Sequence, residues 1–189
     1  STRKESSAAS DVYKRQIAQY FGTVEEHNGT AIDWKSLYEK ALNHDYPEIF
    51  TGDIKTPVKY ASSELNTLFR EVEETMTVKF IEAEFPEDYH KEYKRRLKEG
   101  KDDSIEGQIL SVADKVDLLY ESFGEIQKRN PEKLFFEMYE NSLITIKQYS
   151  HLSCVQDFMH NILTEMLKEP FIPKTELRDI TESIINKEL

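Results

Sequence analysis

Apolar residues recur at intervals of three and four positions along most of this chain, which is the spacing of one face of an α-helix. No stretch of the sequence alternates apolar and polar residues over the length of a strand, and it has no internal repeat and no glycine-rich phosphate loop. We therefore predict an all-α fold. The predicted helices run from Asp33 to the His44-Asp45 pair, from Ser62 or Ser63 past Phe80, from Pro86 to Gly100, from Ser104 past Ile126, after Asn130, from about Ser153 to Glu169, and after Thr175.

The helix that begins near Ser104 has the clearest pattern. Asp103 and Glu106 are spaced as a helix cap with a reciprocal Glu three residues on. The apolar stripe that follows consists of Ile105, Ile109, Val112, Val116, Leu119, Phe123 and Ile126. Asp114 lies between Leu110 and Leu118, so its carboxylate projects from a largely apolar surface and is costly there unless paired, hydrogen-bonded or bound to a cation. Spacing alone does not choose among these partners.

The first part of the chain has only a ragged helical pattern, and 22–33 is expected to be a loop because its polar residues show no apolar period. The run SSAASDVYKRQ, which ends at Gln16, is similar to the translated sequencing-adapter tails found at the ends of assembled metagenomic reading frames. We therefore exclude residues 1–16 from the fold prediction as non-native or incomplete sequence. The alternative is a divergent but genuine first helix.

Composition narrows the function classes. With 189 residues and 38% apolar content, the chain is long enough for one hydrophobic core, and we predict one domain over residues 1–189. A net charge of -11 argues against binding a nucleic-acid polymer, which requires a basic surface. The lone Cys154 cannot form an internal disulfide, and no apolar run is long enough to span a membrane. We expect a cytoplasmic protein.

The candidate chemistry centres on the adjacent His44 and Asp45. Two such side chains can hold one divalent ion only if other segments of the chain supply the remaining ligands. The alternative is that the pair lies at a helix end and faces water. Glu48 lies three residues after Asp45, on the same face if the helix continues through Pro47. The run from Thr51 to Asp53 then ends the helix.

The whole string HDYPEIFTGDIKTPVKY, from His44 to Tyr60, resembles the signature of the HD-domain hydrolases, and specifically that of the YfbR-like 5'-deoxynucleotidases. The HD pair marks the superfamily, whereas the continuation E-x-x-TGD-x-x-TPVKY marks the subfamily. The resemblance implies an HD-domain helical bundle. It also implies an enzyme, a metal-dependent phosphohydrolase that removes the 5'-phosphate from deoxyribonucleoside 5'-monophosphates.

In that family two His and two Asp side chains hold one divalent transition metal such as Co or Mn, which activates the attacking water. The resemblance makes His44, Asp45 and Asp114 metal ligands, because Val112-Ala113-Asp114 matches the family's late A-D element. Asp117 is the alternative if that register is shifted by one turn.

The resemblance also assigns roles to other residues of this chain. Glu48 matches the essential acidic residue, which positions the water or protonates the departing 5'-oxygen. The segment that matches the substrate loop consists of Asp53, Ile54, Lys55 and Thr56, with Asp53 expected to contact the sugar. Lys55 stands where the family often has Pro, which puts its part in that loop in doubt.

The family's first metal ligand is the His of an E-x-V-x-E-H pattern on the first helix. Counting back from Ile17 in that register places Glu5 on the first Glu and Ser10 on the His, so this ligand is missing. The family's phosphate-orienting Arg lies farther upstream and has no match. The resemblance therefore predicts impaired activity for this chain.

Functions of different classes remain open. The first is a 5'-deoxynucleotidase whose natural N-terminal helix carries the missing ligand. The second is a non-catalytic HD-fold protein that binds nucleotides or regulates a partner. A third is an HD phosphohydrolase for cyclic or triphosphorylated nucleotides. The expected partner is a small nucleotide, and the family's dimers imply a homodimer by analogy.

Overall fold

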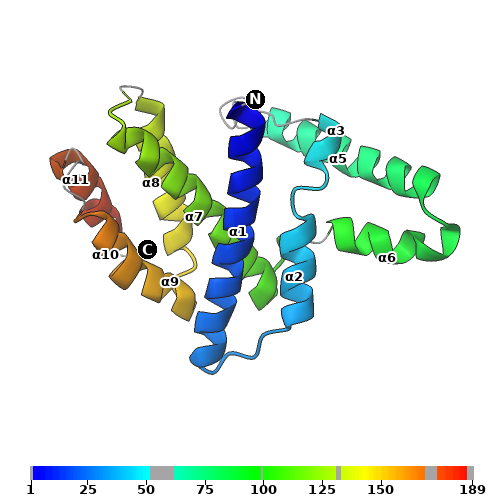
Figure 1. Ribbon diagram of the computed structural model, residues 1–189, viewed down its shortest axis with the longest axis horizontal. Helices are drawn as coiled ribbons and strands as arrows, with labels where there is room; N and C mark the ends of the chain where they lie inside the picture. The colour runs from blue at the N-terminus through cyan, green and yellow to red at the C-terminus, as the bar shows by residue number, and fades with distance from the viewer. Residues whose placement is uncertain (1, 52–61, 99, 131–132, 169–173, 187–189) are drawn as a thin grey trace. The chain divides into compact units, whose positions relative to one another are not determined.

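The computed structural model describes residues 2–51, 62–98, 100–130, 133–168 and 174–186. Helices are the regular structure in this described part, which holds no strand (Figure 1). The predicted all-α fold is confirmed. The chain divides into two compact units: Ser1–Leu37 together with Asp103–Leu189, and Tyr38–Asp102. The assignment of one domain to residues 1–189 stays a prediction.

The first unit is built around α7 (Ile105–Gln127), which packs against both α1 (Thr2–His27) and α8 (Lys133–Lys147) (Figure 1). The predicted stripe of α7 is buried from Ile109 to Ile126, and Leu110 is buried as well. Because helices flank α7 on two sides, its apolar surface extends beyond one stripe. Full burial of each Ile or Leu contributes about 1.5–3 kcal/mol, so α7 is the main source of apolar stabilisation in this unit.

The suspected adapter segment is helical, because α1 begins at Thr2 and continues without a break to His27. The predicted loop over 22–33 is therefore wrong in its first part. A Cβ on Gly22 would lie 2.7 Å from Leu37 Cδ2 and 3.0 Å from Trp34 Cη2. Gly22 is thus a position of close helix packing and does not end the helix.

Glu25, which the sequence suggested was a loop residue, is 2% exposed and joins two distant segments. Its Oε1 accepts a hydrogen bond from the Cys154 backbone N–H at 2.8 Å, and its Oε2 accepts one from Thr30 Oγ1 at 3.1 Å. The Cys154 amide is in the first turn of α9 (Ser153–Asp157), where backbone N–H groups have no partner within the helix. Glu25 therefore supplies a cap from outside that helix.

The start of α7 also differs from the prediction. Ser104, and not Asp103, is the N-cap, because its Oγ accepts from Gly107 N at 3.1 Å. Glu106 Oε1 instead accepts from Asp33 N at 2.8 Å. Asp33 in turn caps α2 (Trp34–Asn43) by accepting from Ser36 N at 3.0 Å, as predicted. One carboxylate therefore ties the start of α2 to the start of α7.

The helix predicted from Ser153 is interrupted by η1 (Phe158–Ile162), a π-helical turn, before α10 (Leu163–Met166). The last helix, α11 (Lys174–Ile185), packs on α8. Lys147 Nζ donates to the carbonyl of Ile184 at 2.6 Å, which caps the C-terminal end of α11. Tyr139 and Thr181 share a buried hydrogen bond of 2.9 Å between the same two helices.

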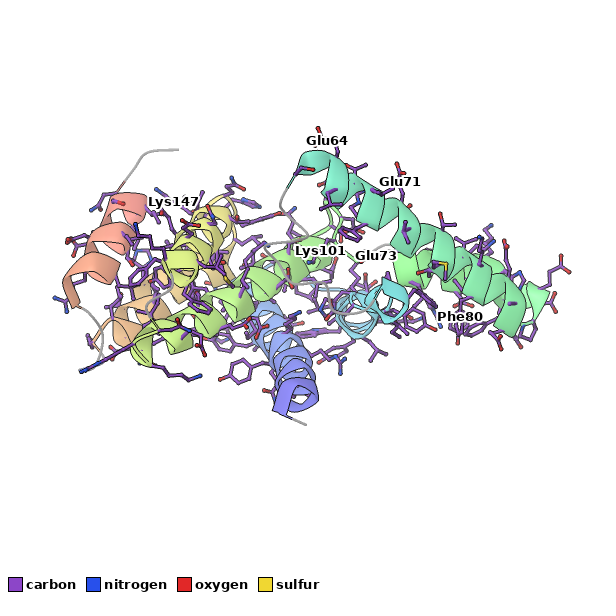
Figure 2. All side chains as sticks on the ribbon, turned by 90° about the horizontal axis from the view of Figure 1, so that it is seen from above. Glu64, Glu71, Glu73, Phe80, Lys101 and Lys147 are labelled. Atoms are coloured by element: carbon purple, nitrogen blue, oxygen red, sulfur yellow. The ribbon has the colours of Figure 1, made fainter. Side chains whose placement is uncertain are left out.

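The second unit begins within α2, at Tyr38. It continues with α3 (Glu48–Thr51), α5 (Ser63–Glu84) and α6 (Glu87–Lys98). Ser62 caps α5, as predicted, by accepting from Leu65 N at 3.1 Å. The side chains of α5 differ in burial. Glu73 and Thr77 are buried, whereas Leu68, Val72 and Met76 are exposed. Figure 2 shows Glu64 and Glu71 on the outer side of α5, with Glu73 and Phe80 on the other side.

None of the described helices is long and apolar enough to span a membrane.

The C-terminal end of α7 carries a strained residue, Arg129, with φ of 61°. Arg129 N bonds to the Ile126 carbonyl and Asn130 N to the Glu125 carbonyl, both at 3.0 Å, which satisfies the last carbonyls of the helix. This arrangement needs a left-handed residue just after the helix, where Gly is favoured because it has no Cβ.

We expect Arg129→Gly to raise the free energy of unfolding by about 0.5–1 kcal/mol, because it removes the left-handed strain of an exposed residue. Urea unfolding followed by circular dichroism measures the change. Arg129→Ala is the control, since it removes the same side chain but keeps the Cβ, and an equal gain in that variant would show that strain is not the cause.

Candidate functional site

The His44-Asp45 pair lies in the turn that follows α2, before α3 begins at Glu48. The helix thus stops before the pair, and the expectation that Asp45 and Glu48 share one helical face is not met. The His44 side chain is 2% exposed and that of Asp45 is 26% exposed. His44 Nε2 and Asp45 Oδ2 are 2.8 Å apart. The turn therefore places an imidazole nitrogen and a carboxylate oxygen side by side.

The tautomer of His44 follows from its other nitrogen. Nδ1 is 2.9 Å from the Ala41 carbonyl, which can only accept, so the neutral ring carries its proton on Nδ1. Nε2 then presents a lone pair, and it is a buried atom with no hydrogen-bond partner of acceptable geometry among the described residues. A lone pair and a carboxylate oxygen at this separation repel each other unless a proton or a metal cation lies between them. This half of the site fits a divalent metal, with the backbone carbonyl orienting the ligand ring.

Aromatic side chains hold this turn against α5. The ring centroids of Tyr46 and Phe50 lie 6.0 and 5.6 Å from that of Phe80 on α5. Phe80 also contacts Phe85, with ring centroids 5.9 Å apart. Burial raises the pKa of the Tyr46 phenol, so its hydroxyl stays neutral. The packing fixes the backbone that directly follows the metal-binding candidates.

Asp114 lies in the other compact unit, on α7. Its neighbours Val112 and Ala113 are fully buried, in agreement with the predicted apolar surroundings. Asp114 Oδ1 is 3.5 Å from Lys14 Nζ on α1, and the two side chains are 20% and 16% exposed. The sequence left open whether this carboxylate is paired or bound to a cation, and a lysine is one partner. Asp117, the alternative ligand, is buried on the same helix.

The remaining predicted residues lie outside the described part of the chain. These are the whole segment with Asp53, Ile54, Lys55 and Thr56, and the side chains of Glu48 and Ser10. Ser10 itself belongs to α1, four residues before Lys14. Because residues four apart share a helix face, the Lys14 contact shows that this face of α1 is the one directed to Asp114. The replacement of a metal ligand by Ser10 stays a prediction.

Within the described residues, no group of three or more His, Cys, Asp or Glu side chains is gathered around one point. His44 and Asp45 lie together in one unit, and Asp114 is paired with Lys14 in its own unit. Glu25 and Glu106 are buried carboxylates whose distant partners sequence reasoning missed, and both bind backbone N–H groups and so serve the fold. An apolar pattern cannot reveal such residues, since their partners are far away in sequence.

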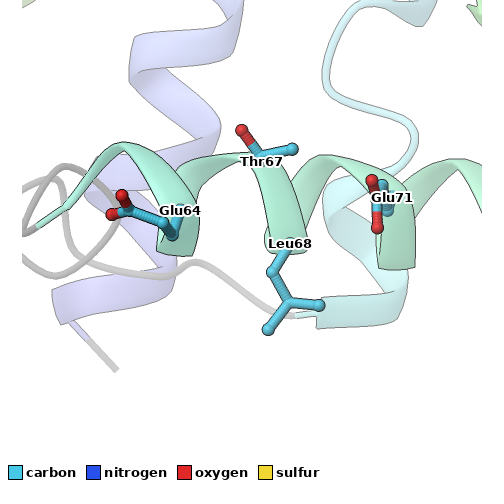
Figure 3. A pocket seen from close by; sticks show the side chains of 4 residues that line it. All are labelled: Glu64, Thr67, Leu68 and Glu71. Atoms are coloured by element: carbon cyan, nitrogen blue, oxygen red, sulfur yellow. The ribbon is translucent and has the colours of Figure 1, made fainter.

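An open groove on α5 is lined by Glu64, Thr67, Leu68 and Glu71 (Figure 3). Among the described residues that line it, two are acidic and none is basic.

Comparison with known proteins gives consistent matches. The family model described as 5'-deoxynucleotidase YfbR-like matches residues 3–166. A 5'-deoxynucleotidase of Pectobacterium atrosepticum is 28% identical over 119 residues, which cover 63% of this chain and 58% of that protein. A 5'-deoxynucleotidase of Shewanella oneidensis is 38% identical over 64 residues, or 32% of this chain and 33% of that protein. The chain thus spans less than two thirds of these curated relatives.

Among solved structures, an HD-domain phosphohydrolase from Listeria innocua has a TM-score of 0.88 and 53% sequence identity. The match covers 95% of this chain and 85% of that protein. The predicted HD-domain fold is therefore confirmed.

We expect His44 to be protonated at Nδ1 when its ring is neutral, the less common tautomer in water. Long-range proton–nitrogen correlation spectra at pH above 8 distinguish the two forms. His90 is the internal control, because its Nε2 lies 2.7 Å from the Phe85 carbonyl and must carry the proton there. The same tautomer in both rings would contradict the geometry on which the ligand role of His44 rests.

Proposed function

Because the chain belongs to the YfbR-like 5'-deoxynucleotidase family, we propose that it is a phosphohydrolase of deoxyribonucleoside 5'-monophosphates. The observation that carries the proposal is the buried Nε2 of His44, 2.8 Å from Asp45 Oδ2, at the position of the family's HD pair. The curated relatives named 5'-deoxynucleotidase and the phosphohydrolase neighbour support the same reaction class. The substrate is a small nucleotide, and the net charge of -11 disfavours a nucleic-acid polymer.

One divalent transition metal, such as Co or Mn, is the proposed cofactor, held by His44, Asp45 and Asp114. When bound, it supplies Lewis-acid activation of water and neutralises phosphate charge. The Ala41 carbonyl holds the proton on Nδ1 of the neutral ring and so leaves the Nε2 lone pair for this role. The fourth ligand position falls on Ser10, which has no imidazole, and we propose that this substitution impairs the chain as it stands.

Glu48 is the proposed general acid/base. It begins α3 directly after the His44-Asp45 turn, so its backbone is positioned by the aromatic packing on α5. In hydrolysis, water forms a bond to phosphorus while the bond from phosphorus to the 5'-oxygen breaks, and that oxygen takes a proton. A carboxyl group can orient the water or deliver the proton. The substrate-contacting residues we propose are Asp53, Ile54, Lys55 and Thr56.

The alternative from another class is a nucleotide-binding or regulatory HD protein without catalysis. The pairing of Asp114 with Lys14 favours this alternative for the present chain, because a lysine occupies the carboxylate that the metal needs. Another HD phosphohydrolase activity, on a different nucleotide, is the further alternative. The lone, buried Cys154 agrees with a proposed cytoplasmic location.

We expect Ser10→His to raise phosphate release from deoxyadenosine 5'-monophosphate at least about tenfold in the presence of Co or Mn. The reason is that losing even a supporting group of a metal ligand costs about 10–100-fold in metal affinity or activity. A colorimetric phosphate assay measures the rate. The full family rate is not expected, because the phosphate-orienting Arg is also missing.

Ala8→His is the matched control, since two residues along an α-helix turn a side chain by about 200°. In the Ser10→His background, Glu48→Gln should lower turnover about 100-fold or more without loss of bound metal. If Ser10→His and Ala8→His release phosphate equally, the ligand register is wrong. If Glu48→Gln loses the metal, Glu48 is a ligand.

We propose in addition that two copies of the chain associate through α5. Its residues Leu68, Val72 and Met76 are 54%, 41% and 40% exposed and recur every fourth position, which forms an apolar stripe. An antiparallel pairing centred on Val72 places Leu68 of one copy opposite Met76 of the other, so that the stripe covers itself in a two-fold symmetric arrangement.

We expect Val72→Glu to convert a dimer to a monomer, because it places like charges at the centre of the symmetric interface. Sedimentation velocity over a range of protein concentrations measures the association. Thr67→Glu adds the same charge about 140° away around the helix and should leave the dimer intact. A starting chain that is monomeric at all concentrations would refute the proposed interface.

A further inference from the structure

The ion pair between Lys14 and Asp114 links α1 to α7 inside one compact unit. The Nζ to Oδ1 distance is 3.5 Å, and both side chains are more than three quarters shielded from solvent. Exposed ion pairs contribute little to folding stability, because water screens the charges and two mobile side chains must be immobilised. This pair is shielded, so its attraction is stronger than that of a surface pair.

The packing around Lys14 keeps its ammonium group in place. On the same helix, Tyr13 makes an edge-to-face contact with Tyr120 of α7, with ring centroids 6.1 Å apart. One turn later, Ile17 and Ala18 are buried. The backbone of α1 is thus anchored on both sides of Lys14, and the lysine loses less freedom in reaching Asp114 than a lysine on a mobile segment would.

We infer that Lys14 is an internal counter-ion of Asp114 that competes with a divalent metal for this carboxylate. The inference rests on the proposed role of Asp114 as a metal ligand. A carboxylate already neutralised by an ammonium group attracts a metal less, and a second cation beside the metal repels it. Since Lys14 lies one turn after Ser10 on the same face, the face of α1 that lacks a ligand also carries a positive charge toward the site.

The counter-ion role differs from the effect of the missing ligand. Ser10 leaves a coordination position without a donor atom, whereas Lys14 adds charge that opposes binding. The two defects are separable by substitution, because they occupy different residues. Removal of the charge at Lys14 should strengthen metal binding even with Ser10 unchanged.

The test measures metal affinity directly. Mn²⁺ is titrated into the metal-free full-length chain and its Lys14→Met variant, with free Mn²⁺ followed by electron paramagnetic resonance. We expect Lys14→Met to bind Mn²⁺ about tenfold more tightly. The melting temperature gives a second readout: the metal-free Lys14→Met protein should melt below the starting chain, because Asp114 loses its counter-ion, and added Mn²⁺ should reverse the loss.

Two controls separate local charge from other effects. Lys14→Arg keeps the positive charge and should bind Mn²⁺ like the starting chain. Lys128→Met removes a lysine whose ion pair with Glu125, 2.8 Å long, lies at the surface of the same unit, and it should also leave the affinity unchanged. The gain in Lys14→Met should disappear when Asp114→Asn is added.

Equal Mn²⁺ affinity of Lys14→Met and the starting chain would overturn the inference, as would a gain that persists without the Asp114 carboxylate. Asp45→Asn in the starting chain distinguishes this failure from failure of the proposed function. If Asp45→Asn loses Mn²⁺ while Lys14→Met has no effect, the proposed metal site is supported and only the counter-ion role is rejected. Absence of Mn²⁺ binding in every variant rejects both.

Discussion

The packing of α1 along α7 is the constraint on which the rest of the larger unit depends. Ile17, Ala18 and Phe21 of α1 are buried, and burying a large apolar side chain contributes about 1.5–3 kcal/mol. The same contact sets which residues of α1 reach Asp114. A change in the rotation of α1 by one residue would direct different side chains at that carboxylate. Core packing therefore decides the charge next to a proposed metal ligand.

Carboxylates, two of them buried, hold the ends of several helices in this acidic chain. Glu25 binds the Cys154 amide, Glu106 binds the Asp33 amide, and Asp33 binds that of Ser36. A buried amide left without a partner costs about 1–3 kcal/mol, and a negative charge is also favoured at a helix N-terminus. Acidic residues in such positions are structural. Burial of a carboxylate in this fold is thus no sign of catalysis by itself.

The proposed metal ligands His44 and Asp114 have different surroundings. His44 is oriented by a backbone carbonyl, so its free nitrogen is directed by α2 itself and needs no other segment. Asp114 is held on a rigid, buried helix but is neutralised by a lysine from α1. The first arrangement favours binding of a cation, and the second opposes it.

The sequence by itself determined the helical class, the family, and the residues of the HD pair. It also determined the caps at Asp33 and Ser62, because periodicity, capping and a contiguous motif are local properties. Tertiary structure decided what depends on distant partners. Gly22 is helical because Trp34 and Leu37 pack on it. Glu106 caps α2 instead of its own helix, and α5 buries Glu73 but exposes Val72. The partner of Asp114 was likewise open in the sequence, since Lys14 is 100 positions away and only the packing of α1 on α7 brings the two charges together.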